Sequence, residues 1–127
     1  SSRRELRYIH ECKTGAMIAA SLKLGAMAVN AEPALVASVG RFGHYLGLAF
    51  QVIDDILDVT QTSEKLGKSA GKDIAAQKTT YPALLGLESA RREARRLTAL
   101  ANRALQPFGS GGVRLRQLAD HLLAREY

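Results

Sequence analysis

Three aspartates stand close together in the most apolar part of this sequence: Asp54, Asp55 and Asp58. On a helix, Asp54 and Asp58 lie one turn apart on the same face, with Asp55 about a third of a turn aside. Three carboxylates so placed repel one another, and burying an uncompensated charge is costly. No basic residue lies one turn away on the same helix. A metal ion, or cationic side chains from elsewhere, is therefore expected to compensate them.

Magnesium is the metal that this pattern favours. It prefers hard oxygen ligands and is commonly held by one or two carboxylates together with substrate phosphates. The alternative is a solvated helix end whose carboxylates meet only water, because an Asp-Asp-x-x-Asp pattern also arises by chance.

Four lysines follow the aspartates in a polar, glycine-containing stretch: Lys65, Lys68, Lys72 and Lys78. Acids on a helix, followed by cations, suit a complex of magnesium with a diphosphate, since ammonium groups neutralise the remaining phosphate charge. We interpret Lys65 and Lys72 as exposed surface charges.

A third polar element is the short run Lys13-Thr14-Gly15. Lysine offers a mobile point charge and threonine a hydroxyl. Glycine at position 15 is expected to interrupt or kink the helix there.

These residues need helices to position them, and the composition predicts an all-α chain because Ala, Leu, Glu, Lys, Arg and Gln are plentiful and Pro is rare. One domain over 1–127 is expected. Apolar periodicity and Pro33 predict helices over about 3–29, 34–60, 82–105 and 113–125, with a loop at 61–80 and a turn at 107–112.

The second of these helices is apolar almost all round and should be buried on most sides. Gly40, Gly43 and Gly47 lie on or near one stripe of it. Each costs about 1 kcal/mol against alanine in a helix interior. Close approach of a neighbouring helix is the expected compensation, and simple local tolerance is the alternative.

The formal net charge is +6, which favours an anionic partner. The arginines at 91–96 are interpreted as a solvated face rather than a nucleic-acid site, because Glu88 and Glu93 are available for pairing and aromatic residues are not interleaved. No apolar run is long enough to span a bilayer. Cys12 is the only cysteine, which fits a reducing, cytoplasmic compartment.

The motifs occur in one order that resembles the C-terminal part of the trans-type polyprenyl diphosphate synthases, which include farnesyl and geranylgeranyl diphosphate synthases. The matching motifs are Ile9-His10-x-x-Lys13-Thr14-Gly15, Phe50-Gln51-x-x-Asp54-Asp55-x-x-Asp58, Gly67-Lys68-x-x-Gly71-x-Asp73 and Lys78-x-x-Tyr81-Pro82. The resemblance covers nearly the whole chain. It implies the C-terminal helices of the isoprenoid synthase bundle.

The resemblance implies roles for the acidic motif and its neighbours. Asp54 and Asp55 match residues that bind magnesium on the allylic diphosphate, and Asp58 completes that motif. Phe50 matches an aromatic residue that lines the substrate cavity. Asp73 matches an acid on a loop that closes after binding.

The resemblance also implies the catalytic and substrate-binding residues. Lys13 and Lys68 match lysines that contact the allylic diphosphate, and Lys78 matches a further lysine near it. Thr14 and Gln51 match polar residues beside the forming carbocation. The implied catalytic residues are therefore Lys13, Thr14, Gln51 and Lys68.

The implied reaction condenses an allylic diphosphate with isopentenyl diphosphate over magnesium and releases diphosphate. The family's first aspartate-rich motif is absent from this chain, which opens at Ser1 without a methionine. We therefore expect a fragment that is inactive alone and needs the N-terminal half or another chain. Missing helices would leave apolar surface exposed, so a homo-oligomer is also expected.

Two other functions stay open. A class I terpene cyclase shares the helical fold, but typically carries a different second metal motif. A non-catalytic regulatory subunit of a prenyl synthase would explain the missing motif, but need not keep these aspartates and lysines.

Overall fold

The computed structural model describes residues 2–77 and 86–124, although of positions 3, 6, 7, 10, 11 and 62–77 only the backbone. The helices are α1 (Arg3–Ala28), α2 (Pro33–Gln77), α4 (Leu87–Ala104) and α5 (Val113–Leu123), with a 3-10 helix, η1 (Gln106–Gly112), before α5. Within the described ranges there is no strand, so the predicted all-α class is confirmed. None of the described helices is long and apolar enough to cross a membrane.

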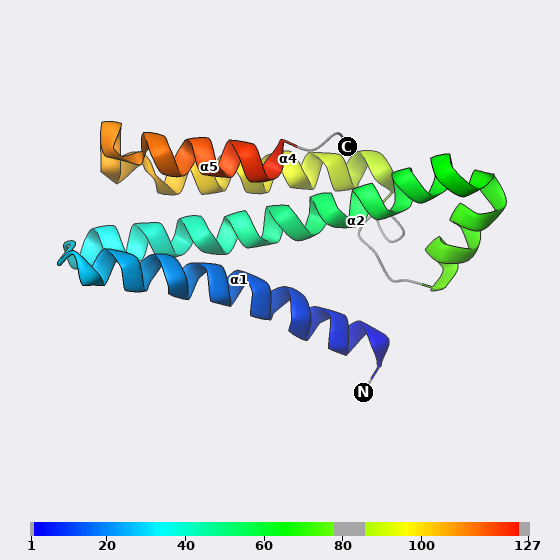
Figure 1. The fold of residues 1–127 in the computed structure, drawn as a ribbon, viewed down its shortest axis with the longest axis horizontal. Coiled ribbons are helices and arrows are strands. Elements are labelled where there is room, and N and C mark those ends of the chain that lie inside the picture. Colours follow the sequence, from blue (N-terminus) through cyan, green and yellow to red (C-terminus); the bar gives the residue numbers. More distant parts are fainter. Residues whose placement is uncertain (1, 78–85, 125–127) are drawn as a thin grey trace.

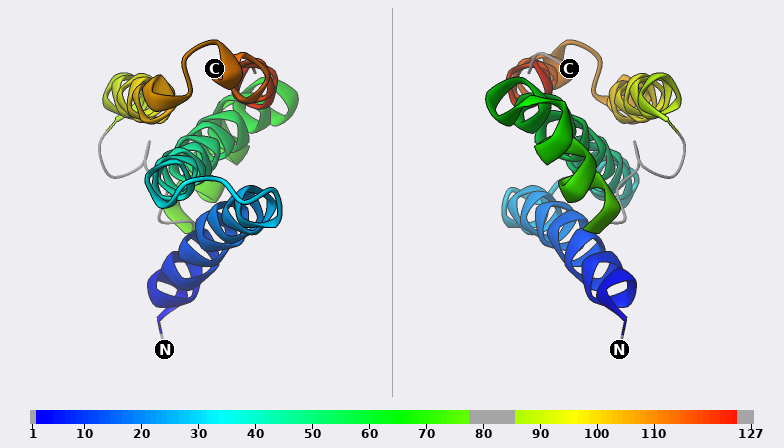
Figure 2. Two further views of the ribbon diagram at one scale, coloured as in Figure 1. Left: turned by 90° about the vertical axis from the view of Figure 1, so that its left-hand side faces the viewer. Right: turned by 90° about the vertical axis from the view of Figure 1, so that its right-hand side faces the viewer.

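Three layers make up the molecule, with α2 in the middle. Figure 2 shows α1 on one side of α2, with α4 and α5 on the other. The long axes of α1 and α2 run antiparallel (Figure 1). The central position of α2 agrees with its nearly continuous apolar sequence.

The start and end of α1 follow from local sequence signals. Ser2 accepts a hydrogen bond from the backbone N–H of Glu5, and the Glu5 carboxylate accepts one from the backbone N–H of Ser2. This reciprocal capping satisfies two helix-terminal donors. The chain leaves the helix after Ala28, where Asn30 takes a positive φ of 56° before Pro33 opens α2.

The kink expected near Gly15 is wrong, because α1 continues as one helix from Arg3 to Ala28. The glycine serves close packing instead. A Cβ atom placed on Gly47 would lie 2.6 Å from the Cα atom of Gly15. Neither helix could carry a side chain at this contact, so backbone approach compensates the low helix propensity of glycine.

A second contact of the same kind lies one turn along. A Cβ atom on Gly43 would lie 2.9 Å from the Cα atom of Ala19. The predicted role of the glycine stripe in helix packing is therefore confirmed at Gly43 and Gly47.

The loop predicted at 61–80 is also wrong over most of its length, because α2 continues to Gln77. The stretch has no proline, and its Lys, Ala, Glu and Gln residues are good helix formers. Two glycines, at 67 and 71, lower helix stability by about 1 kcal/mol each but do not block a helix. The expected closing loop at 67–73 is therefore helical in its backbone, and Figure 1 shows α2 bending in this region.

The core lies between α2 and the layer formed by α4 and α5. Phe42, Ile53 and Ile56 of α2 are fully buried, as is Leu105 at the end of α4. The buried face of α4 is small: Ala90, Ala94, Leu97 and Ala101. Small residues on α4 allow its backbone to lie close to the bulky side chains of α2.

The C-terminal elements agree with their predicted positions. The predicted turn is the 3-10 segment, in which Gly109 has a φ of 53°. The last helix begins at Val113 as predicted and ends at Leu123. The predicted start of the preceding helix at Pro82 lies outside the described residues, and α4 is described from Leu87.

Candidate active site

The α2 face that contacts α1 changes character along its length. Its residues follow at spacings of three or four: Gly40, Gly43, Gly47, Gln51, Asp54 and Asp58. At about 3.6 residues per turn this spacing keeps all six on one face. The glycines that pack against α1 therefore give way, on the same face, to the polar residues predicted for the site.

The exposure of the residues on this face rises from Gly47 toward Asp58. Gly47 is buried, Gln51 and Asp54 are half-buried, and Asp58 is exposed. Figure 1 shows why, since α1 and α2 lie close together at the turn that joins them and diverge toward the N-terminus of α1. The carboxylates thus lie where the helices separate, which leaves Asp54 and Asp58 within reach of water or a ligand.

Asp55 has a different environment from its two neighbours. It is 5% exposed and is the only charged residue among those found buried in the described part of the chain. All three aspartates take part in polar interactions. The sequence expectation that Asp55 stands apart from Asp54 and Asp58 therefore agrees with their burial.

The aspartates do not by themselves form a metal cage. In the part of the chain that the structure describes, no group of three or more His, Cys, Asp or Glu residues converges as metal ligands. Magnesium is nevertheless commonly held by one or two carboxylates and by substrate phosphates. The accessible carboxylates of Asp54 and Asp58 fit that donor set.

The α1 residues of the predicted site split between two sides of the helix. Thr14 is half-buried, whereas Lys13 is exposed. Because each residue turns a helix by about 100°, Lys13 lies nearly half a turn from Gly15, which faces α2. The structure therefore does not bring Lys13 onto the α2-facing side, where Asp54 and Asp58 lie.

Tyr8 lies level with the acidic motif. The contacts of Gly15 with Gly47 and of Ala19 with Gly43 set an antiparallel register in which Tyr8 is level with Asp54 along the helix axes. A hydrogen bond with the Cys12 side chain raises the pKa of the exposed Tyr8 hydroxyl above its ordinary value. No pattern in the sequence distinguished Tyr8 from the other tyrosines.

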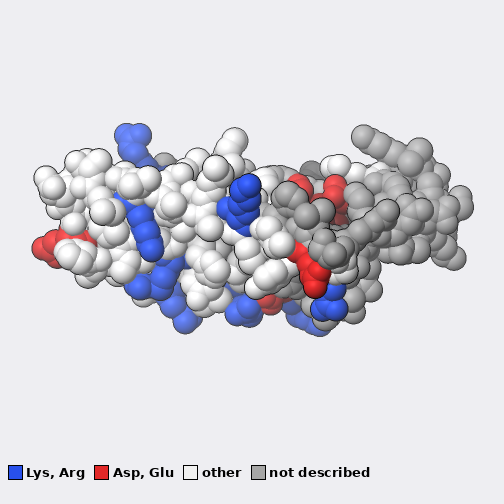
Figure 3. Space-filling view, turned by 90° about the horizontal axis from the view of Figure 1, so that it is seen from below, with Lys and Arg blue, Asp and Glu red and all other residues white. Residues whose placement is uncertain are grey.

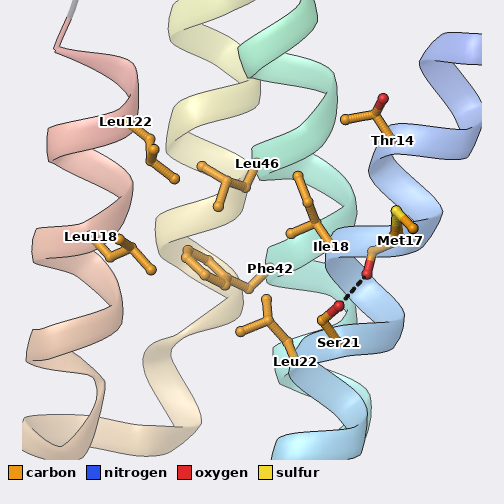
Figure 4. Close-up of a pocket in the computed structure, with 9 residues that line it drawn as sticks. All are labelled: Thr14, Met17, Ile18, Ser21, Leu22, Phe42, Leu46, Leu118 and Leu122. Carbon is orange, nitrogen blue, oxygen red and sulfur yellow. Dashed lines mark hydrogen bonds between the residues drawn. The ribbon is translucent and has the colours of Figure 1, made fainter.

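An apolar groove of about 350 Å³ lies between α1, α2 and α5, with Thr14 at one end (Figure 4). Its lining is Thr14, Met17, Ile18, Ser21, Leu22, Phe42, Leu46, Leu118 and Leu122. The Ser21 hydroxyl donates to the Met17 carbonyl oxygen at 2.8 Å, so its hydrogen-bonding capacity is used within α1. The groove is therefore suited to a hydrocarbon and is within the size range of small-molecule sites.

Sequence reasoning missed this groove. Its signal was present, since Leu118 and Leu122 repeat at a helical spacing on α5. That spacing identifies an apolar face but does not say which helices it meets.

The remaining predicted residues are placed only in part. Phe50 is half-buried on α2 beside Gln51. Lys65, Lys68 and Lys72 lie on the described backbone of α2, but their side chains are outside the described residues, as is Lys78 altogether.

The outer side of α1 is mainly uncharged. Figure 3 views the molecule from this side, and uncharged residues dominate the described surface. Exposed apolar residues of α1 include Ile9, Met17, Leu24 and Met27. Lys13 falls on the same stripe, between Ile9 and Met17 at spacings of four residues.

An all-helical fold with a carboxylate triplet at a helix divergence and an apolar groove defines a class of helical proteins by architecture alone. Comparison with known proteins narrows this class. Residues 1–107 match the family described as polyprenyl synthetase. The chain therefore belongs to the polyprenyl synthetase family, and the resemblance drawn from the sequence motifs is confirmed.

Individual relatives agree with this assignment. A dimethylallyltranstransferase of Fischerella ambigua is 43% identical over 122 residues, covering 96% of this chain and 35% of the relative. A chloroplastic geranylgeranyl pyrophosphate synthase of Capsicum annuum is 46% identical over 122 residues, covering 95% of this chain and 33% of the relative. The chain thus spans about a third of the length of these curated relatives.

A solved structure supports the fold. A crystal structure from Marinomonas sp. MED121, provisionally assigned as a farnesyl-diphosphate synthase, superposes with a TM-score of 0.74 at 35% sequence identity. The superposition covers 97% of this chain and 40% of that protein. The all-α isoprenoid synthase fold expected from the resemblance is therefore confirmed.

Proposed function

We propose that this chain supplies the second aspartate-rich half of the active site of a chain-elongating prenyltransferase. The reaction condenses an allylic diphosphate with isopentenyl diphosphate and releases diphosphate. Family membership and the functions for which the relatives are named support this proposal. The observation that carries it is the α2 face on which packed glycines give way to Gln51, Asp54 and Asp58 as the helices diverge.

Asp54 and Asp58 would hold magnesium through their accessible carboxylate oxygens, with Asp55 as the third member of the motif. When bound, the metal supplies positive charge that stabilises the departing diphosphate. The half-buried position of Asp54 strengthens its interaction with a cation, since screening by water is weaker there.

Lys13, Lys68 and Lys78 would neutralise phosphate oxygens that the metal leaves uncompensated. Lys13 is exposed on the outer side of α1, so this role requires the diphosphate, or the rest of the protein, to extend to that side. We therefore expect residues beyond this chain to complete the phosphate site.

Thr14 and Gln51 would face the carbon from which diphosphate departs. Their oxygen atoms are suited to stabilising the positive charge that develops when the carbon–oxygen bond breaks. The allylic carbon then bonds to isopentenyl diphosphate, and loss of a proton restores the double bond. Phe50 would line the cavity beside Gln51, and the groove adjoining Thr14 would take part of the hydrocarbon.

We propose further that the chain alone is inactive, because the family's first aspartate-rich motif is absent from its sequence. The N-terminal half of the enzyme or another chain would supply it, and a homo-oligomer would bring further contacts. One relative is by name the large subunit of a heterodimeric geranylgeranyl pyrophosphate synthase. The single cysteine fits a cytoplasmic location, although several relatives are chloroplastic by name.

Isothermal titration with a non-hydrolysable allylic diphosphate tests the proposal, with and without magnesium. We expect magnesium-dependent binding that Asp54→Ala weakens at least tenfold, because a metal ligand is lost. Asp120→Ala is the matched control, since Asp120 is an exposed carboxylate on α5 outside the site. Equal binding with and without magnesium, or equal loss in both variants, would contradict the proposed role of the motif.

A further inference from the structure

A second hollow lies away from the aspartates, between α2, the C-terminal end of α4 and η1. Its volume is about 580 Å³, and it is lined by Arg41, Tyr45, Leu100, Arg103, Ala104, Gln106 and Pro107. Arg41 comes from α2 and Arg103 from α4, so arginines of two different helices line one hollow. Among the described residues, none of those that line it is acidic.

Arg103 differs from two other arginines of α4, which pair with glutamates. Arg91 pairs with Glu88 and Arg96 with Glu93, each at 2.7 Å. Arg103 makes no hydrogen bond or ion pair with the described residues, and it has no acidic residue one turn before or after it. The positive charge near the end of α4 is thus not neutralised locally.

The Arg41 side chain is likewise held by a residue that is not acidic. Its guanidinium Nη2 donates to the Ser38 hydroxyl at 3.1 Å, and Ser38 is buried. This contact restricts the Arg41 side chain while leaving most of its five N–H donors for another acceptor. A restricted guanidinium loses less entropy when it binds an anion.

A structural role explains part of this arrangement. A basic residue in the last turn of a helix interacts favourably with the helix dipole, and Arg103 occupies that position on α4. The dipole does not explain why Arg41, on another helix, lines the same hollow. Nor does it explain the half-buried Tyr45 and Leu100, which give the hollow an apolar wall.

We propose that the Arg41–Arg103 hollow binds a phosphate or diphosphate group. Guanidinium forks match phosphate oxygens in geometry as well as in charge. The Gln106 amide adds a neutral donor at the rim, and the apolar wall suits the organic part of a phosphate ester. The ligand class is therefore a small phosphorylated molecule, either the free anion or its ester.

This hollow is separate from the proposed catalytic centre. Arg41 precedes Asp54 by 13 residues on α2, which corresponds to about 20 Å along a helix axis. The end of α4 and η1, which contribute residues to the hollow, lie at the end of the molecule where α1 joins α2 (Figure 1). The inference therefore does not rest on the proposed prenyltransferase activity.

Titration of the full 127-residue chain with inorganic diphosphate tests the proposal, in magnesium-free buffer with chelator at low ionic strength. We expect saturable binding that Arg41→Gln and Arg103→Gln each weaken at least tenfold. Arg103→Lys should give an intermediate affinity, because it keeps the charge but not the fork. An alkyl diphosphate distinguishes the sources: tighter binding than inorganic diphosphate identifies an ester, and equal binding identifies the free anion.

The controls separate this hollow from general charge and from the catalytic site. Arg92→Gln removes an exposed arginine of α4 whose guanidinium contacts Ser89, and it should leave diphosphate affinity unchanged. Absence of saturable binding, or equal weakening by Arg92→Gln and Arg103→Gln, would overturn the proposal. Weakening by Lys13→Gln without weakening by Arg41→Gln or Arg103→Gln would also overturn it, because the binding would then belong to the proposed catalytic site.

Discussion

Gly47 shows how a single atom decides the packing of two helices. Because its absent Cβ would lie 2.6 Å from the Gly15 backbone, Gly47→Ala must push α1 and α2 apart. We expect a loss of about 1–3 kcal/mol in the free energy of unfolding, the range typical of overpacked contacts. Urea denaturation measures the change.

Gly25→Ala is the matched control for this prediction. Like Gly47 of α2, Gly25 lies in a helix interior, in α1, but a Cβ atom there would meet nothing within 4 Å. Alanine should therefore stabilise the chain by up to about 1 kcal/mol through helix propensity alone. If both alanine variants shifted stability in the same direction, the close contact would not be the reason for glycine at position 47.

Phe42 links the core to the apolar groove. It is fully buried and also lines the groove beside α1 and α5. Phe42→Ala should lower the free energy of unfolding by about 3–5 kcal/mol, since it removes buried area and leaves a cavity. Leu24→Ala on the exposed side of α1 should change it by less than about 0.5 kcal/mol.

At the scale of the element, α4 pairs two of its arginines with glutamates, Arg91 with Glu88 and Arg96 with Glu93. Glu93 accepts two hydrogen bonds from Arg96, at 2.7 and 2.9 Å, and these lower the pKa of Glu93 below its ordinary value. A lowered pKa in the folded state stabilises the fold fully at pH above the ordinary glutamate pKa. This stabilisation is lost as pH falls through the lowered folded-state pKa.

Glu93→Gln tests this electrostatic contribution. Water still reaches the pair, since the side chain of Arg96 is 60% exposed and that of Glu93 is 24% exposed, so the variant should lose less than about 1 kcal/mol at neutral pH. The difference between variant and parent should shrink in acid, as measured by thermal unfolding between pH 7 and pH 3. A difference that grew as pH fell would contradict the proposed role of the carboxylate charge.

At the scale of the whole molecule, the outer face of α1 exposes more large apolar side chains than an ordinary surface. Met17 and Leu24 are each 66% exposed on this face. Exposed apolar stripes of this kind mark interaction surfaces. The chain spans only about a third of its curated relatives, and the proposed partner half would have to pack somewhere on this molecule.

Sedimentation of the isolated chain tests whether this face associates. We expect Met17→Glu to shift the chain toward monomer, because a charge in an apolar contact is costly to desolvate. Ala99→Glu adds the same charge on an exposed position of α4 and should not change the distribution. Equal effects of the two substitutions would show that net charge, not the α1 stripe, controls association.

Local rules were sufficient for much of the fold. The all-α class, the break before Pro33 and the start of α5 at Val113 depend on propensity, periodicity and proline, which act between residues close in sequence. The family could be identified for a similar reason, since its motifs are short ordered runs such as those around Lys13 and Asp54.

Two local predictions that treat glycine as a helix breaker are wrong: the kink near Gly15 and the loop at 61–80. Gly15 does not kink α1. The space that its absent side chain leaves is where Gly47 of α2 packs. The stretch after Gln61 stays helical in α2, since its good helix formers outweigh Gly67 and Gly71. A glycine has the same low propensity in both uses, so its sequence position alone cannot distinguish a break from a contact.

The sequence by itself determined the all-α class, most of the helix positions and the family, and it supplied the candidate site residues as predictions. Only the tertiary structure decided how those residues are distributed in space. It placed Asp54 and Asp58 where α1 and α2 diverge, put Lys13 on the outer side of α1, and brought Arg41 and Arg103 to one hollow. Such relations depend on the register and separation of whole helices, which long-range packing sets and which no spacing within one helix encodes.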